Sequence, residues 1–327
     1  MCNLLMARGP DGIKILYESN RDNPQSWYFQ GEVDSRMKLR GGAAATAVVL
    51  PQNPDGSYCL SQNQDVYIAI ETNDKGGIIS KNQLVSSAKG FMRNNRDWRS
   101  IEQHGYFLID PSNDNPDASI IFTAHTADPY ASYPNTCLGQ GYHFQVFRDG
   151  TSRFAKSLWY PSGFLYTPKK SLLASLDGRW VGFKFVCIVV KLGVVKLEVY
   201  VDEGYLTNNW QPLDTITDQG GWGGQELSLD IEEREYNACG GTTDQVLDMG
   251  APNVAFAWRG FSDEDGICFD KLGIREVGPK QSITDLPVQR ASGFGSQKVK
   301  FGVQPEKPAY YSGDSENFAE TDRPEGF

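Results

Sequence analysis

Residues 141 to 156 read Gly141-Tyr142-His143-Phe144-Gln145-Val146-Phe147-Arg148-Asp149-Gly150-Thr151-Ser152-Arg153-Phe154-Ala155-Lys156. This segment reads as two successive strands with the turn residues Asp149-Gly150 between them. An Asp-Gly pair suits a tight hairpin turn, because both central positions of such a turn need positive φ. The pattern therefore predicts an antiparallel β-hairpin.

The length of the turn decides which side chains of this hairpin meet. A two-residue turn predicts the cross-strand pairs His143–Lys156, Gln145–Phe154 and Val146–Arg153. His143, Gln145 and Lys156 then share one face of the sheet, and Tyr142 and Arg153 lie on the other. A three-residue turn would shift this register by one residue.

Further strand patterns lie on both sides of the hairpin. Their ranges are Ile13 to Tyr17, Asp65 to Glu71, Ile101 to Asp110, Val181 to Val190, Lys196 to Asp202 and Phe269 to Val277. Alternation places Glu102, His104 and Tyr106 on one face of their strand. An aromatic content of 12% and 34 glycines suit strands and tight turns better than helices. The chain is therefore expected to be an all-β sandwich.

Length and charge limit the domain organisation and the partners. A chain of 327 residues can bury a large core, and one β-sandwich can use most of it. The net charge of −10 argues against a nucleic-acid partner, which would need a basic surface. No apolar run of 18 residues indicates a membrane span, and residues 1–8 are too short for a signal peptide.

The composition changes near the C-terminus. Pro, Gly, Ser and charged residues dominate from residue 279 onward, which predicts an extended or disordered arm over 279–327 after a sandwich over 1–278. A neighbouring subunit could hold such an arm, so we expect it to mediate a homo-oligomer or assembly contact.

The six cysteines form no CxxC pair and no Cys/His cluster, so a zinc site is not expected. Cys187 lies within an apolar strand and is expected to be a buried thiol. Cys137 and Cys239 lie in polar, glycine-rich loops, where a disulfide between them is a hypothesis.

Several segments of the chain together carry a family resemblance: Gly12 to Tyr17, Trp27-Tyr28, Ser152 to Lys156, Asp177 to Lys184, Asn208-Asn209-Trp210, Asp218 to Gly223 and Cys239-Gly240-Gly241. They resemble the concanavalin A-like jelly roll, the β-sandwich of LamG-like domains, legume lectins, glucanases and some polysaccharide lyases. More closely, the chain is similar to microbial, often archaeal, lectin-like or polysaccharide-lyase-like domains. The resemblance implies a jelly-roll sandwich of two antiparallel sheets, and an extracellular, cell-surface or virion-exposed location. It does not choose between binding and catalysis, since this fold hosts both.

A lyase acting on uronates needs a group that neutralises the carboxylate, a base for the α-proton and an acid for the leaving oxygen. Gln145 or Arg153 could neutralise the carboxylate, and His143 could take the proton. Tyr142 or Tyr160 could protonate the leaving oxygen. The catalytic candidates are His143, Gln145, Lys156 and Tyr160. The other interpretation is an ordinary polar sheet face.

The enzyme motifs of the resembled families are incomplete. Jelly-roll alginate lyases carry a Gln-x-His pair and an Arg-x-Glu-x-Arg strand, whereas this chain has His143-Phe144-Gln145 and lacks the second motif. Glucanases of this fold use a Glu-x-Asp-x-x-Glu strand, to which Glu32-Val33-Asp34 and residues 230–235 are the nearest strings. The first lacks a third carboxylate, and the second is read as a solvated charge run. Glycoside hydrolysis is therefore disfavoured.

Aromatic and polar residues together favour carbohydrate recognition, because sugar rings stack their C–H faces on aromatic rings. The ligand-binding candidates are Tyr142, Arg153, Trp159, His104 and Tyr106. For Trp159 and Tyr160, stacking on a sugar and packing of a loop are both open. The predicted function is recognition of a polysaccharide or cell-surface glycan on a concave sheet face. The alternatives are a polysaccharide lyase for an acidic glycan and a structural component of a virion or surface assembly.

Two acidic residues near strand ends, Asp202 and Asp270, could hold a structural Ca²⁺, since carboxylate oxygens suit this ion. No EF-hand spacing is present in the sequence. No other cofactor is expected.

Overall fold

The computed structural model describes residues 7–19, 24–31, 37–41, 52–60, 66–71, 98–112, 115–126, 141–157, 164–222, 246–247, 255–261 and 266–278. All of them belong to the first of two compact units, residues 1–286. The predicted arm over 279–327 lies outside the described residues and stays a prediction.

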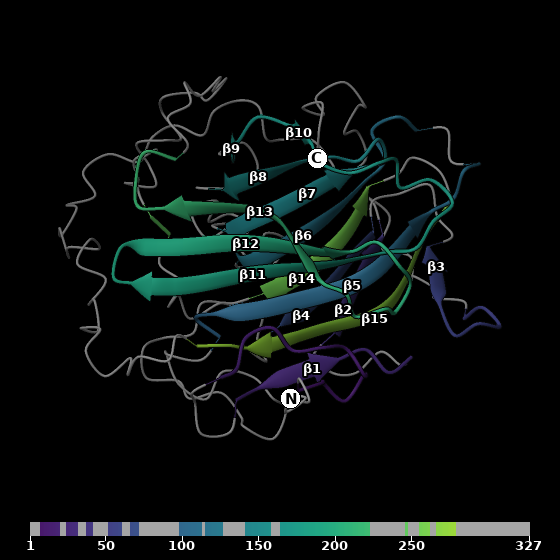
Figure 1. Cartoon of the computed structure of the whole chain (residues 1–327), viewed down its shortest axis with the longest axis horizontal. Coiled ribbons are helices and arrows are strands. Elements are labelled where there is room, and N and C mark those ends of the chain that lie inside the picture. Colours follow the sequence, from purple (N-terminus) through teal and green to yellow (C-terminus); the bar gives the residue numbers. More distant parts are fainter. Residues whose placement is uncertain are drawn as a thin grey trace, which may run out of the picture. The chain divides into compact units, whose positions relative to one another are not determined.

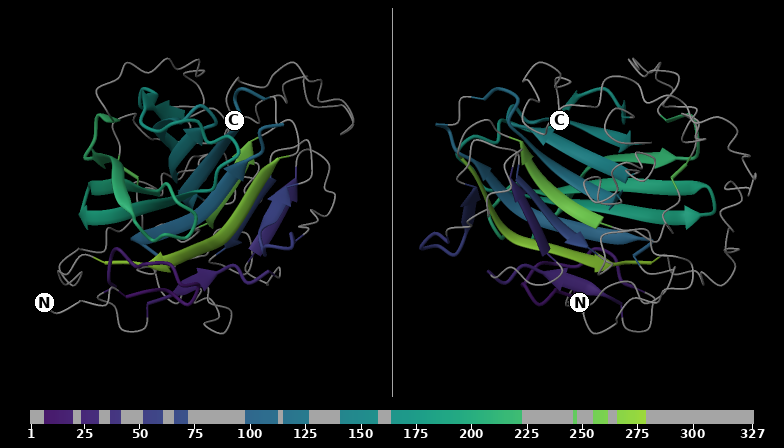
Figure 2. Two further views of the ribbon diagram at one scale, coloured as in Figure 1. Left: turned by 45° about the vertical axis from the view of Figure 1, so that its right-hand side comes forward. Right: turned by 180° about the vertical axis from the view of Figure 1, so that it is seen from behind.

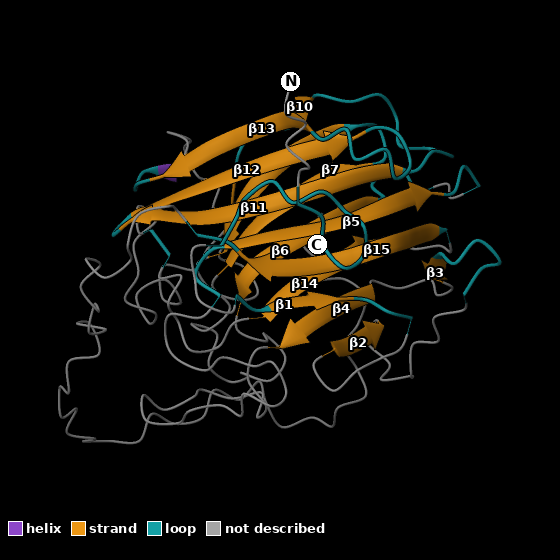
Figure 3. Cartoon of the chain, turned by 60° about the horizontal axis from the view of Figure 1, so that its bottom comes forward, coloured by secondary structure: helices purple, strands orange, loops and turns teal. Residues whose placement is uncertain are grey.

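Apart from a short helical turn at Trp222, the regular structure of the described residues consists of strands in two antiparallel sheets (Figures 1 and 3). The first sheet has the order β1-β15-β5-β11-β12-β13, and β3 pairs with β15 beside this path. Its strands are β1 (Ser26–Tyr28), β3 (Tyr58–Leu60), β5 (Ile101–Ile109), β11 (Val181–Lys191), β12 (Val194–Asp202), β13 (Gln211–Asp218) and β15 (Ile267–Glu276).

The second sheet has the order β10-β8-β7-β6-β14-β4-β2, with β9 beside β8. Its strands are β2 (Met37–Gly41), β4 (Val66–Glu71), β6 (Ser119–Thr126), β7 (Gly141–Phe147), β8 (Thr151–Ser157), β9 (Phe164–Tyr166), β10 (Lys170–Ser171) and β14 (Ala255–Phe261). Consecutive strands change sheet at several points, among them β5 to β6, β10 to β11, β13 to β14 and β14 to β15. The described residues thus form an all-β sandwich of two antiparallel sheets, as the sequence predicted, and Figure 2 shows the two layers from two further sides.

The core lies between the two sheets. Alternate residues of the central strands fill it, among them Phe144 and Phe154 of the second sheet and Phe183 and Phe185 of the first. The Phe144 ring centroid lies 6.2 Å from that of Phe183 and 6.4 Å from that of Phe185. Each such fully buried side chain contributes about 1.5–3 kcal/mol relative to an exposed one. Inward-facing aromatic residues therefore hold the two layers together.

The predicted hairpin register is wrong by one residue. The turn between β7 and β8 has three residues, and the amide of Gly150 donates to the carbonyl of Phe147. Gly150 has φ of 82°, and a Cβ there would lie 2.3 Å from the Leu173 carbonyl oxygen. In a three-residue hairpin loop, the third residue usually has positive φ. The observed pairs are Tyr142–Lys156, His143–Ala155, Phe144–Phe154, Gln145–Arg153 and Val146–Ser152.

The N-terminal segment does not form the strand predicted over Ile13 to Tyr17. It makes only an isolated bridge between Arg8 and Lys14. Ile13 packs with Tyr106 and Trp210 on the outer face of the first sheet, the face directed away from the second sheet. We call residues 7–19 the N-terminal strap.

A disulfide that the sequence did not indicate joins Cys59 of β3 to Cys268 of β15. The two residues are direct partners in the strand register, which brings residues 209 positions apart together. The proposed partners Cys137 and Cys239 lie outside the described residues. Cys187 is a buried free thiol, as predicted, and burial raises its pKa.

Candidate functional site

The outer face of the second sheet carries the polar side chains of the β7–β8 hairpin. Tyr142 and Phe144 point into the core, so strand alternation turns His143 and Gln145 outward. Arg153 is the direct partner of Gln145 and shares its face. The structure therefore brings His143, Gln145 and Arg153 together.

Gln145 bridges two neighbouring strands through its amide. Its Nε2 donates to Oγ of Ser119 on β6 at 3.0 Å, and its Oε1 accepts from Nε of Arg153 at 2.9 Å. Gln145 is buried, so both bonds are made away from bulk water. The amide therefore fixes the position of the Arg153 guanidinium.

The Arg153 guanidinium carbon lies 4.0 Å from the Tyr166 ring centroid and 5.3 Å from that of Phe147. On the same Phe147 ring, Nζ of the exposed Lys169 lies 3.6 Å from the centroid. Burial lowers the pKa of Arg153, although a guanidinium remains charged at neutral pH. We call Gln145, Phe147, Arg153, Tyr166 and Lys169 the β8–β9 cluster.

His143 lies beside this cluster with both ring nitrogens engaged. Nδ1 is 3.0 Å from Oγ1 of Thr123, and Nε2 is 3.0 Å from Oγ of Ser157. The Phe164 ring packs against the imidazole with centroids 5.6 Å apart. Hydroxyl groups on both nitrogens hold the ring in place and leave neither nitrogen open as a base.

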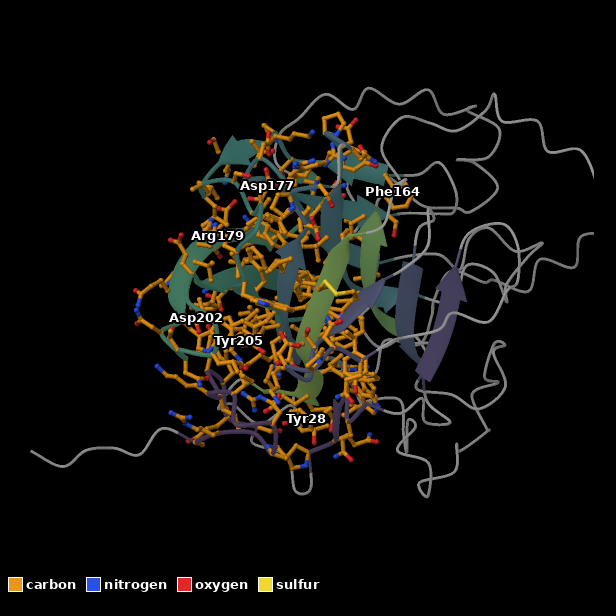
Figure 4. All side chains as sticks on the ribbon, turned by 90° about the vertical axis from the view of Figure 1, so that its right-hand side faces the viewer. Tyr28, Phe164, Asp177, Arg179, Asp202 and Tyr205 are labelled. Atoms are coloured by element: carbon orange, nitrogen blue, oxygen red, sulfur yellow. A yellow bond between two sulfur atoms is a disulfide. The ribbon has the colours of Figure 1, made fainter. Side chains whose placement is uncertain are left out.

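Two aromatic rings of β9 remain partly exposed on this face. Phe164 and Tyr166 are both half-buried, and their ring planes are nearly parallel, at 19° with centroids 6.2 Å apart. They share a face because they flank Leu165, which points into the core. Tyr166 lies against the Arg153 guanidinium and Phe164 against the His143 ring, so an apolar surface adjoins hydrogen-bonding groups. Figure 4 shows Phe164 on the opposite side of the view from Tyr205 and Asp202.

Lys156 lies on the face opposite His143 and Gln145, contrary to the prediction. The one-residue shift of the hairpin turns it into the space between the sheets. There its Nζ lies 3.0 Å from Oδ2 of Asp218, at the end of β13, and both side chains are 0% exposed. The Trp222 ring centroid is 5.2 Å from the same nitrogen. Lys156 therefore forms a buried ion pair between the two sheets.

Tyr142 belongs to this internal cluster and not to the outer face. Its hydroxyl donates to Oδ2 of Asp218 at 2.6 Å and accepts from the Leu247 amide at 3.1 Å. Burial and the charge of Asp218 raise the pKa of Tyr142. The ligand-binding prediction for Tyr142 is therefore not supported, because the side chain is buried and its hydroxyl is already paired.

His104 and Tyr106 lie on the other sheet, on its outer face beneath the N-terminal strap. They share that face with Glu102, as the alternation predicted. Both are buried, His104 at 2% exposure and Tyr106 at 0%. The structure therefore separates them from His143, and both side chains are covered.

His104 is held by the strap itself. Its Nε2 lies 2.6 Å from Oδ2 of Asp11, and its Nδ1 has no partner among the described residues. Burial and the nearby Lys184 lower the pKa of His104. We therefore assign a neutral imidazole that donates from Nε2 to the carboxylate.

The calcium prediction at Asp202 and Asp270 is not supported. Asp202 Oδ2 accepts from the Tyr106 hydroxyl at 2.6 Å and from the Asn208 amide at 2.7 Å. Asp270 accepts from the Tyr205 hydroxyl at 2.7 Å. Hydrogen-bond donors surround these carboxylates, and the described part of the chain holds no group of three or more acidic, His or Cys side chains placed for a metal.

Some predicted residues lie outside the described ranges: Trp159, Tyr160, Cys137 and Cys239. Four residues of the site were not predicted: Phe164, Tyr166, Phe147 and Lys169. The alternation of Phe164-Leu165-Tyr166 is the sequence signal that could have indicated the first two.

Within the described ranges, no helix has the length and apolar character needed to cross a membrane. No family model matches the chain, and no curated protein matches it.

The chain resembles several solved structures in fold. One is the CBM2 module of the evolved Dit of Lactobacillus casei BL23 phage J-1, with 10% identity, coverage of 80% of this chain and 100% of that chain, and a TM-score of 0.40. A second is the legume lectin-like domain from Entamoeba histolytica, with 11% identity, 77% and 97% coverage, and a TM-score of 0.39. A third is the PL-14 alginate lyase from the marine Aplysia kurodai, with 8% identity, 64% and 82% coverage, and a TM-score of 0.35. Similarity of this degree does not indicate an activity.

Proposed function

We propose that the chain binds a glycan on the outer face of the second sheet, over β7, β8 and β9. Phe164 and Tyr166 would receive the C–H face of a sugar ring, and Arg153 and Gln145 would position its oxygen atoms. The observation that carries the proposal is the partly exposed, nearly parallel pair of rings beside a fixed guanidinium. Apolar rings with a few placed polar groups are typical of carbohydrate sites.

Binding fits the described residues better than a lyase reaction does. A lyase needs a base and an acid that converge on one sugar. Hydroxyl groups engage both nitrogens of His143, while Lys156 and Tyr142 point into the sandwich. Tyr160, the other residue predicted to protonate the leaving oxygen, lies outside the described residues. We therefore place the lyase second.

A glycan array tests the proposal. We expect the wild-type protein to bind at least one glycan, and the Tyr166→Ala variant to bind it about tenfold more weakly, since about 1.4 kcal/mol corresponds to tenfold. Tyr205→Ala is the matched control. Tyr205 is an exposed tyrosine that also stacks on an aromatic ring, with its ring centroid 5.1 Å from that of Trp180, but it belongs to the loop after β12.

Melting curves of both variants confirm that they are folded before binding is compared. No binding across the array contradicts the proposed function. Loss of binding in Tyr205→Ala with retention in Tyr166→Ala places the site on the other sheet and also contradicts it.

A further inference from the structure

Two cations on the outer face of the second sheet have no acidic partner among the residues that the structure describes. The described residues offer Arg153 one polar contact, the Gln145 amide oxygen, and offer Lys169 none. Four other cations of the described residues do have a carboxylate partner: Arg148 with Asp177, Lys170 with Asp214, Arg179 with Glu203 and Lys196 with Glu198.

The lack of a partner is notable because carboxylates are abundant in this chain. The sequence has 41 Asp and Glu residues against 31 Lys and Arg, so acidic residues outnumber basic ones. A chain with surplus carboxylates nevertheless places aromatic rings and the Gln145 amide, but no carboxylate, against Arg153 and Lys169 in the part of the sheet that the structure describes. Cation–π contacts stabilise a guanidinium, but they leave its outer N–H groups without an acceptor among the described residues.

The geometry suits an anion. Gln145 fixes Nε of Arg153, and the Tyr166 ring supports the guanidinium plane, so the terminal nitrogens are pre-positioned. A guanidinium binds the two oxygens of a carboxylate or sulfate in a bidentate manner. Lys169 adds a second positive charge over the same Phe147 ring that Arg153 contacts.

The strand register places further residues in line with Gln145 and Arg153 across the second sheet. Gln145 pairs with Ile121 of β6, which pairs with Arg259 of β14. Arg259 pairs with Tyr67 of β4, and Tyr67 with Arg40 of β2. Two further arginines thus occupy register positions in line with Arg153, along a path that crosses the strands.

From these observations we propose that the glycan is anionic, and that Arg153 and Lys169 form a subsite for its carboxylate or sulfate groups. This inference rests on the proposed function and names the substrate class of the same site. The polymer would lie across the strands of the second sheet, with its charged groups at the β8–β9 cluster and its sugar rings against Phe164 and Tyr166.

Titration calorimetry with matched polymers tests the inference. The anionic probes are polygalacturonate, alginate, hyaluronate and dextran sulfate, and the neutral probes are the carboxyl-reduced forms of the first three and plain dextran. We expect at least one anionic polymer to bind more than tenfold more tightly than its neutral counterpart, with affinity that falls as salt rises. Comparing the affinities for the uronate polymers and for dextran sulfate shows which anion the site prefers.

Variants locate the subsite. Arg153→Gln and Lys169→Gln should each weaken binding of the anionic polymer about tenfold, and Lys169→Gln should leave any binding of its neutral counterpart unchanged. Lys169 is exposed, so its variant should fold even if Arg153→Gln does not. The controls are Arg8→Gln and Lys191→Gln, which remove exposed positive charges elsewhere and should have no effect.

The outcomes separate this inference from the proposed function. Equal binding of anionic and neutral polymers by the wild-type protein overturns the anionic subsite only. The same conclusion follows if Lys169→Gln and a folded Arg153→Gln both bind the anionic polymer as tightly as the wild-type protein does. Binding of neutral array glycans with no binding of any anionic probe also overturns the anionic subsite only. No binding of any polymer or array glycan overturns both.

Discussion

Replacing Lys156 with methionine should lower the free energy of unfolding by about 3–5 kcal/mol. The change leaves the Asp218 carboxylate, which is 0% exposed, without its positive partner. The Tyr142 hydroxyl at 2.6 Å and the Gly220 amide at 3.1 Å still donate to it, but they carry no charge. Removal of one partner of a buried pair is costly because the remaining charge stays desolvated. Urea unfolding followed by tryptophan fluorescence measures the effect.

Two further variants make this test specific. The double variant Lys156→Met/Asp218→Asn should recover much of the lost free energy, because it removes the uncompensated charge and keeps a hydrogen-bond acceptor for Tyr142. The control is Lys170→Met, since Lys170 also joins the two sheets but is 47% exposed in its pair with Asp214. That control should cost less than about 1 kcal/mol. Equal costs for Lys156→Met and Lys170→Met would contradict the buried pair.

Replacing Glu102 with glutamine should also cost about 3–5 kcal/mol. The carboxylate lies 2.7 Å from Nζ of Lys184 and 2.8 Å from a terminal nitrogen of Arg275, and it is buried. It also accepts the backbone amides of Leu16 and Tyr17 at 3.2 and 3.1 Å. The variant would leave two buried cations without an anion and weaken the attachment of the N-terminal strap.

The same carboxylate predicts a pH dependence. Burial raises the pKa of Glu102, but Lys184 and Arg275 outweigh burial and lower the pKa from 4.5 to about 2. Because the folded-state pKa is depressed, the stabilisation is fully present above about pH 4.5 and is lost as the pH falls toward 2. The difference corresponds to about 3 kcal/mol.

Urea midpoints between pH 6 and pH 2 measure this dependence. The wild-type midpoint should fall steeply below pH 4.5, and the Glu102→Gln profile should be shallower in the same range. Asp11 adds to the slope in both proteins, since its pKa is also lowered by His104 despite the opposing effect of burial. Parallel profiles for the two proteins would contradict the assignment to Glu102.

The strands could be predicted from the sequence because alternation is local. The pattern over 101–110 becomes β5, and that over 181–190 becomes β11, each within one residue at its ends. The hairpin was also correct, but its register depended on whether Arg148 belongs to the turn. That one residue exchanges Lys156 and Arg153 between the faces, so it changes the composition of the candidate site.

Other features required the tertiary structure. Nothing local to Cys59 or Cys268 indicates that β3 pairs with β15. Burial of His104 follows from the contact with Asp11, which is 93 residues away, and the sequence does not indicate that the strap lies over this face. Alternation could place Phe164 and Tyr166 on one face of a strand, but only the sheet order brings that strand beside β8 and Arg153.

Hydrogen–deuterium exchange with and without a bound glycan tests the location of the site most directly. We predict that a saturating glycan slows exchange in peptides covering residues 145–157 and 164–171, which contain the β8–β9 cluster. Peptides covering residues 177–210, with Trp180 and Tyr205, should be unchanged. Slower exchange over 177–210 with no change over 145–171 would contradict a glycan site on the outer face of the second sheet.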